Sequence, residues 1–226
     1  MDWLTNLNWR AMIISLIISL PAIIIGLTFH EYAHGWAAYK LGDPTAKSAG
    51  RLTLNPIAHL DPIGFIALLL FHFGWAKPVP INPMYFKGDR KKGIILVSLA
   101  GPLSNLLLAL GSGILLYLLQ NQAFLYSNDA AILLLLEYFV LINVILAVFN
   151  LIPIPPLDGS KILFGLVPGY PNWMLQLERY GFLILIVLMI LGIFGMIIQW
   201  IAYPIYELLS PTDVLIKGYY IIPQSR

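Results

Sequence analysis

The chain of 226 residues contains no cysteine. This absence excludes disulfide bonds, a cysteine nucleophile and any metal site built from thiolates. A metal ion bound by this chain would therefore need histidine and carboxylate ligands. The sequence offers four histidines and eleven acidic residues for that purpose.

Charged residues are scarce as well. The 13 Lys and Arg and the 11 Asp and Glu make up 11% of the chain, less than half of the ~25% that is usual in soluble domains. Hydrophobic residues account for 59%, which excludes a disordered chain and a basic module that binds nucleic acid. The composition predicts an all-α integral membrane protein in contact with the lipid bilayer, and no nucleic-acid partner.

Long apolar runs set the expected architecture. Four of them are long enough to cross a bilayer as helices, at about 11–38, 93–119, 130–152 and 181–202. The apolar run at 63–75 is too short for a full span and predicts a re-entrant segment. The proline-rich stretch at 77–83 predicts a short extended or hairpin segment at the membrane boundary. We therefore expect a helical bundle of about five to six transmembrane or re-entrant segments, forming a single domain over 1–226.

The basic residues predict an orientation. Eight of the thirteen lie between Lys40 and Lys92, whereas the loop at 120–129 contains none. Because cytoplasmic loops carry an excess of Lys and Arg, we expect 40–92 and 153–180 to face the cytoplasm. The chain is thus expected to be a multi-pass protein of the cell membrane.

The first apolar run contains the sequence His30-Glu31-Tyr32-Ala33-His34. On a helix, His30 and His34 lie one turn apart and project from the same face at a spacing that suits Zn²⁺, while Glu31 lies beside them as a base for a metal-bound water. The alternative is a polar patch at a helix contact. Ionisable groups at membrane depth are costly, which favours the metal site.

A zinc site in a hydrolase usually has a third protein ligand. Asp158 is the best candidate because it follows a proline-rich break, 153–156, at membrane depth, where irregular backbone is tolerated only if it is buried or lines a cavity. Alternatively, Asp158 could cap the short helix expected at 161–166. The other candidates are His59, His72, Glu137, Glu178 and Glu207.

Three motifs together resemble the site-2 protease family of zinc intramembrane metalloproteases. They are the His-Glu-x-x-His sequence at 30–34, Gly-Pro-Leu-Ser-Asn at 101–105, and Asn150 with Pro153 and the sequence Pro-Leu-Asp-Gly at 156–159. The resemblance covers about 20–165 and is closest to the short prokaryotic multi-pass form without a PDZ or CBS domain. Many members have a span before the one with the histidines, whereas here the motif lies in the first apolar run.

The resemblance implies an endopeptidase that cuts peptide bonds within or near transmembrane segments, as in regulated intramembrane proteolysis. It implies one Zn²⁺ per chain, held by His30, His34 and Asp158, with an active site towards the cytoplasmic side. Glu31 is implied as the general base that activates zinc-bound water. Asn150 is implied to position the substrate or stabilise the oxyanion.

Further residues have weaker signals. Pairing of the 77–83 segment with an unwound substrate would make Val79 and Ile81 substrate-positioning residues, although the segment could equally be a plain boundary loop. Asn105 could reach the site and help to position the substrate, but its small-residue neighbours favour close helix packing. His59 is either an auxiliary ligand or proton relay, or a hydrogen-bonded histidine at the boundary.

Two polar residues of the third long run are open to another interpretation. Glu137 and Asn143 lie a little under two turns apart and either pair with another helix or line a water path.

One other class of function fits a metal site in a membrane protein. A zinc-binding transporter or client-holding protein would use the same ligands without cutting a peptide bond. Transporters commonly contain paired inverted repeats, and no second half matching the histidine motif is present in the sequence. A transporter also has no use for a base at Glu31, which favours the protease.

Overall fold

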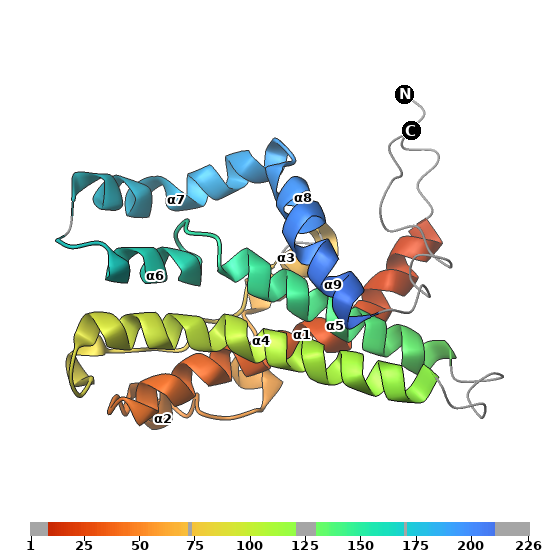
Figure 1. The fold of residues 1–226 in the computed structure, drawn as a ribbon, viewed down its shortest axis with the longest axis horizontal. Coiled ribbons are helices and arrows are strands. Elements are labelled where there is room, and N and C mark those ends of the chain that lie inside the picture. The colour runs from red at the N-terminus through yellow and green to blue at the C-terminus, as the bar shows by residue number, and fades with distance from the viewer. Residues whose placement is uncertain (1–8, 72–73, 121–129, 170, 211–226) are drawn as a thin grey trace.

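The computed structural model describes residues 9–71, 74–120, 130–169 and 171–210. Three long helices form its centre: α1 (Trp9–Lys40), α4 (Arg90–Gln120) and α5 (Ala130–Asn150). They pack against one another along much of their length (Figure 1). Their shared core contains Ala22 from α1, Ala109 from α4, and Val140 and Val144 from α5, all fully buried.

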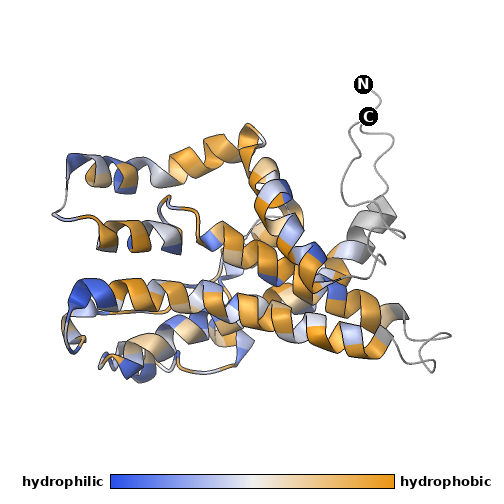
Figure 2. Ribbon diagram, viewed as in Figure 1, coloured by the Kyte–Doolittle hydropathy of each residue, from blue (hydrophilic) through white to orange (hydrophobic). Residues whose placement is uncertain are grey.

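Four helices are long and apolar enough to cross a membrane, namely α1, α4, α5 and α7 (Asn172–Ile190). Most of their residues are hydrophobic, as the orange of their ribbons in Figure 2 shows. On α4, for example, Leu103, Leu107 and Ile114 are each more than half exposed. Such a surface is unsuited to water and suits lipid chains. The expected multi-pass, all-α membrane protein is confirmed.

The connection between α1 and α4 contains short elements that return to their starting point. They are α2 (Thr45–Ser48), η1 (Pro56–Ala58), α3 (Pro62–Phe71) and η2 (Pro83–Tyr85). An isolated antiparallel bridge joins Leu60 to Ala76 just outside α3, and the amide of Lys77 donates to the carbonyl of His59 at 2.8 Å. Because both ends of this loop meet, α3 enters and leaves on one side, as expected for a re-entrant segment.

The proline-rich stretch at 77–82 is neither helical nor paired in a ladder. It is fastened to the protein at several points. The carbonyl of Lys77 accepts from Arg51 Nη2 at 2.6 Å, and the amide of Asn82 donates to Asp43 Oδ2 at 2.7 Å. Arg51 and Asp43 are themselves buried. The stretch is therefore anchored at both ends, and it forms no hairpin among the described residues.

The chain after α5 differs in two respects from the expected pattern. Helix α6 (Asp158–Leu166) begins three residues earlier than expected. The last apolar run is not one span, because α7 ends at Ile190 and Gly192 adopts a left-handed conformation (φ +71°) before a second helical stretch. That stretch comprises α8 (Ile193–Ile197), the π-helical turn η4 (Ile198–Ala202) and α9 (Tyr203–Leu209). Glycine adopts such a conformation without the steric cost that other residues incur.

Candidate metal centre

The histidine motif lies on α1, and Asp158 is the first residue of α6, yet their side chains meet. His30 Nε2 and His34 Nε2 lie 3.0 Å apart, and Asp158 Oδ2 lies 3.1 Å from the first and 2.9 Å from the second. All three residues are buried, with exposed fractions of 4–5%. Within the described part of the chain, this is the one group of three or more His, Asp or Glu residues arranged to hold a metal ion.

Each of the three side chains is held at the atom that points away from the cluster. His30 Nδ1 lies 2.7 Å from Asn105 Oδ1, and His34 Nδ1 lies 2.7 Å from the carbonyl of Val97. Asp158 Oδ1 accepts from Lys161 Nζ at 3.0 Å. Partners of this kind are typical of metal ligands, because they fix the orientation of the ligand and the tautomer of its imidazole.

The far partners determine what the cluster can bind. A carbonyl oxygen only accepts, so we assign the Nδ1 proton of His34 to the bond with Val97, which leaves Nε2 of a neutral ring as a lone pair. The same assignment for His30 brings two imidazole nitrogens and a carboxylate oxygen together within about 3 Å of one another. Three such acceptors repel unless a positive charge lies among them. Their separations are close to the roughly 3.3 Å expected around a tetrahedral zinc ion, so the residues fit the metal.

The carboxyl of Asp158 is suited to this arrangement. Burial raises the pKa of this carboxyl, whereas the Lys161 ammonium group, 3.0 Å from Oδ1, lowers it. The ionised form is the one that would bind a metal ion. Its alternative role as a helix cap is wrong, since Leu157 occupies the N-cap position of α6 and no side-chain cap bond is formed.

Glycines provide the space for this cluster. Gly101 on α4 faces the two imidazoles, and a Cβ atom at this position would lie 2.6 Å from His30 Cε1 and would also clash with His34 Nε2. Gly159 lets the start of α6 lie against the backbone of Leu151 and Ile152. The glycines of both sequence motifs are thus explained by close approach rather than by turns.

We expect Gly101→Ala to reduce zinc affinity by at least about tenfold, a loss typical of disturbed ligand orientation. Gly111→Ala on the same helix is a matched control, because a Cβ there would meet nothing within 4 Å and alanine favours a helix interior. Zinc affinity would be measured in detergent by competition with a fluorescent chelator. Equal affinities of the two variants would contradict the proximity of Gly101 to the ligands.

Glu31 lies beside the cluster rather than in it. Its Oε2 accepts a hydrogen bond from the amide of Val79 at 2.8 Å, and its side chain is half-buried. The side chain of Val79 packs against Gly35, which lies on α1 like Glu31. A Cβ atom added at Gly35 would lie 3.2 Å from Val79 Cγ1. The stretch at 77–82 is thereby connected directly to the carboxylate expected to act as a base.

Asn150 and Ile81, which were also predicted for the site, lie outside the group of His30, His34 and Asp158. Asn150, at the end of α5, donates from Nδ2 to the carbonyl of Leu146 in its own helix at 3.0 Å and makes no hydrogen bond to the three clustered side chains. Ile81 is half-buried and packs against the cluster formed by Ala38, Phe86 and Val97. Their expected roles towards a substrate stay predictions.

His59 is buried but lies outside the group of His30, His34 and Asp158. Its Nε2 donates to the carbonyl of Thr53 at 2.8 Å, which fits the interpretation of a hydrogen-bonded histidine better than that of an auxiliary ligand. Of the other candidates for a third ligand, Glu137 is fully buried in α5, whereas Glu178 and Glu207 are exposed. His72 lies outside the described residues.

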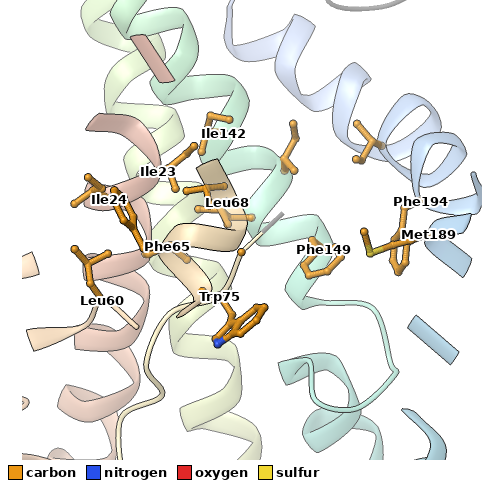
Figure 3. Close-up of a pocket in the computed structure, with 16 residues that line it drawn as sticks. Ile23, Ile24, Leu60, Phe65, Leu68, Trp75, Ile142, Phe149, Met189 and Phe194 are labelled. Carbon is orange, nitrogen blue, oxygen red and sulfur yellow. The ribbon is translucent and has the colours of Figure 1, made fainter. Parts of the chain in front are cut away.

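An apolar cavity of about 340 Å³ lies next to this region. Figure 3 shows side chains of several helices around it, among them Ile24 from α1, Phe65 from α3, Phe149 from α5 and Phe194 from α8. Leu27, which also lines it, precedes His30 by less than one turn. The cavity is thus close to the face of α1 that carries His30 and His34, although neither of them nor Asp158 lines it.

Some polar groups of the site carried little or no sequence signal. The carbonyl of Val97 has none, because any residue could supply it. Lys161 follows Asp158 by three residues on the same helix, and this spacing could have indicated the ion pair. The partner of Asn143 is Asn105 on α4, so the expectation that Asn143 pairs with another helix is confirmed.

Comparison with known proteins agrees with this geometry. The model of peptidase family M50 matches residues 18–194. Among curated relatives named putative zinc metalloproteases, YwhC of Bacillus subtilis is 45% identical over 79% of this chain and 82% of its own length. MJ0611 of Methanocaldococcus jannaschii is 35% identical, over 67% of this chain and 71% of its own length. Rip2 of Mycolicibacterium smegmatis is 31% identical, over 77% of this chain and 67% of its own length.

No solved structure matches the chain. The match to the family model covers more than half of the sequence, however, and the relatives share the zinc and protease assignments in their names. The expected resemblance is confirmed. The chain belongs to peptidase family M50, the site-2 proteases, and is a multi-pass membrane zinc metalloendopeptidase.

Proposed function

We propose that this protein is an intramembrane endopeptidase that cuts peptide bonds within or near the transmembrane segments of other membrane proteins, as in regulated intramembrane proteolysis. The depth of the ligand cluster carries the proposal. His30 and His34 lie ten and six residues before the end of α1 at Lys40, which is about 15 and 9 Å along the helix axis. A substrate bond must reach the same depth.

The residues have distinct roles in this proposal. His30, His34 and Asp158 hold one zinc ion, which when bound polarises the scissile carbonyl and makes water a nucleophile at neutral pH. Glu31 accepts a proton at its carboxylate and returns it to the leaving amine. The amide of Val79 holds Oε2 of Glu31, so the carboxylate keeps one orientation. Asn150 supplies an amide donor towards the substrate carbonyl.

A transmembrane substrate helix must unwind before it can be cut, because its peptide groups are already hydrogen-bonded. Pairing with the stretch at 77–82 would compensate for the bonds lost. Pro78 and Pro80 have no amide proton, and the amides of Lys77, Val79 and Asn82 are bonded within the protein. Among the hydrogen bonds of the described residues, none involves the amide of Ile81. We therefore assign Ile81 the donor contact with the substrate, while the amide of Val79 holds Glu31.

The proposed location is the cytoplasmic membrane, with the site towards the cytoplasm. The N-terminal end of α4, which carries Arg90, Lys91 and Lys92, lies at the same end of the bundle as the turn between α6 and α7 (Figure 1). Figure 2 shows hydrophilic residues concentrated there. The positive-inside rule assigns this end to the cytoplasm. His34 lies nearer to the Lys40 end of α1, which is at this side, than to the Trp9 end.

The test uses the full chain in detergent with a panel of single-span membrane proteins and a water-soluble unfolded protein as substrates. We expect cleavage of single-span substrates within or next to their apolar segment, located by mass spectrometry. A chelator should stop this cleavage, and added Zn²⁺ should restore it, because the ligands remain in place. Cleavage of the soluble substrate alone would contradict intramembrane proteolysis while leaving the peptidase activity intact.

A further inference from the structure

Two buried amides connect the first ligand of the candidate metal centre to the centre of the bundle. Asn105 on α4 and Asn143 on α5 are both fully buried. Asn105 Nδ2 donates to Asn143 Oδ1 at 2.8 Å, and Asn143 Nδ2 donates to the carbonyl of Phe139 in its own helix at 2.9 Å. The Oδ1 atom of Asn105 lies 2.7 Å from His30 Nδ1.

The orientation of the Asn105 amide follows from its partners. Its Nδ2 lies 3.0 Å from the carbonyl of Gly26 on α1, and a carbonyl can only accept. The NH₂ group must therefore face Gly26 and Asn143, and the oxygen must face His30. Both protons of Asn105 are used, and the oxygen is left for one task, which is to accept the Nδ1 proton of His30.

Gly26 allows the approach of these side chains. A Cβ atom at this position would lie 2.8 Å from Asn143 Oδ1 and 2.9 Å from Leu146 Cδ1. The backbone of α1 is thus open where the two amides lie against it. Burying two amides costs free energy that apolar side chains of similar size would avoid, so close packing by itself does not account for them.

We propose that Asn105 is a positioning residue for His30, and that Asn143 acts on His30 only through Asn105. By accepting the Nδ1 proton, Asn105 fixes the ring plane and leaves Nε2 as the lone pair directed at the metal. Asn143 fixes Asn105 in turn. This inference rests on the proposed zinc site and assigns Asn105 to the ligand rather than to the substrate.

The experiment measures zinc affinity of the full chain in detergent by competition with a fluorescent chelator. Asn105→Leu removes the acceptor, and we expect affinity to fall by about 10- to 100-fold. Asn105→Asp keeps an oxygen for His30 but loses the donors to Gly26 and Asn143, and we expect it to bind zinc at least about tenfold more tightly than Asn105→Leu. Thr28→Val is the matched control, because Thr28 is buried two residues before His30 and its hydroxyl donates to the carbonyl of Ile24 in its own helix.

Asn143→Leu tests the second step. We expect a loss of zinc affinity at the low end of the same range, about tenfold or less. The double variant with Asn105→Leu should be no weaker than Asn105→Leu alone, because Asn143 has no separate effect on His30. Additive losses would show independent effects and would overturn the assigned order.

The outcomes separate the inference from the site on which it rests. Zinc that stays bound in His34→Ala would overturn the proposed metal site and this inference together. Zinc lost in His34→Ala but bound normally in Asn105→Leu would overturn only the positioning role. Equal losses in the Leu and Asp variants of Asn105, with lower unfolding temperatures of both zinc-free proteins, would show that the amides serve packing alone.

Discussion

Replacing Glu31 by Gln is expected to reduce cleavage of a single-span substrate by about 10²- to 10⁴-fold, the usual contribution of a general base. Gln cannot accept the proton, but its amide oxygen can still accept the hydrogen bond from Val79 that Oε2 receives at 2.8 Å. The local structure should therefore persist. Bound zinc should be unchanged, because Glu31 lies outside the group of His30, His34 and Asp158.

Cleavage rate and bound zinc would be measured on the same preparation of this variant. Glu178→Gln on α7 is a suitable control, since Glu178 is exposed and loses the same charge. Cleavage by Glu31→Gln at a rate near that of the unmodified chain would show that another group is the base. Loss of zinc from this variant would instead assign Glu31 to the metal.

Asp158→Asn is expected to reduce zinc affinity by more than about 100-fold, beyond the range found when only the partner of a ligand is removed. The amide has nearly the shape of the carboxylate but no negative charge to hold the cation. Helix α6 should still form, because Asp158 makes no side-chain cap bond at its start. The half-exposed Lys161 can turn to water when its partner becomes neutral.

Zinc content after dialysis and the zinc dissociation constant would test this expectation. Asp61→Asn is the control, because Asp61 Oδ1 accepts from the amide of Gly64 at 2.8 Å and an amide oxygen can accept the same bond. Full zinc occupancy of Asp158→Asn would transfer the role of third ligand to another residue. Loss of zinc from both variants would indicate a general effect of lost charge.

The long apolar helices were predictable because membrane depth imposes a simple rule on composition. The expected runs at 11–38, 93–119 and 130–152 correspond to α1, α4 and α5. It was also predictable from its length that α3 would not be a full span. Its closure by the bridge between Leu60 and Ala76 was not, because pairing across fifteen intervening residues carries no local signal.

The break at Gly192 shows where such rules fail. Residues 189–196 are apolar throughout, so nothing in hydropathy separates a helix that continues from one that ends. Glycine is compatible with both outcomes inside a membrane, and the choice is made by packing. In the structure, Phe194 packs with Ile152, Leu157 and Leu185 in one cluster, which favours a turn that returns the chain to the end of α5.

The candidate metal centre also has one part that the sequence predicts and another part that depends on how the helices pack. The His-Glu-x-x-His spacing predicts two ligands on one helix face, since helical periodicity fixes their relation. The meeting of Asp158 with them depends on how α6 lies against α4. The proline-rich break before Asp158 made it the best candidate, and the resemblance to a family implied it as the third ligand. The partners of the far atoms, such as the carbonyl of Val97 and the amine of Lys161, could not be assigned before the helices were in place.

The hydrogen bonds on the outer side of the three ligand side chains have a consequence for the protein in the absence of zinc. Asn105, the carbonyl of Val97 and Lys161 hold the ligand side chains through bonds that involve no metal. Folding therefore orders these ligands in part, and a bound ion would offset the repulsion that remains among their acceptor atoms. In small zinc domains, by contrast, loss of the ion unfolds the chain. A cell short of zinc would accordingly keep this protease folded but inactive, and able to regain activity without new synthesis.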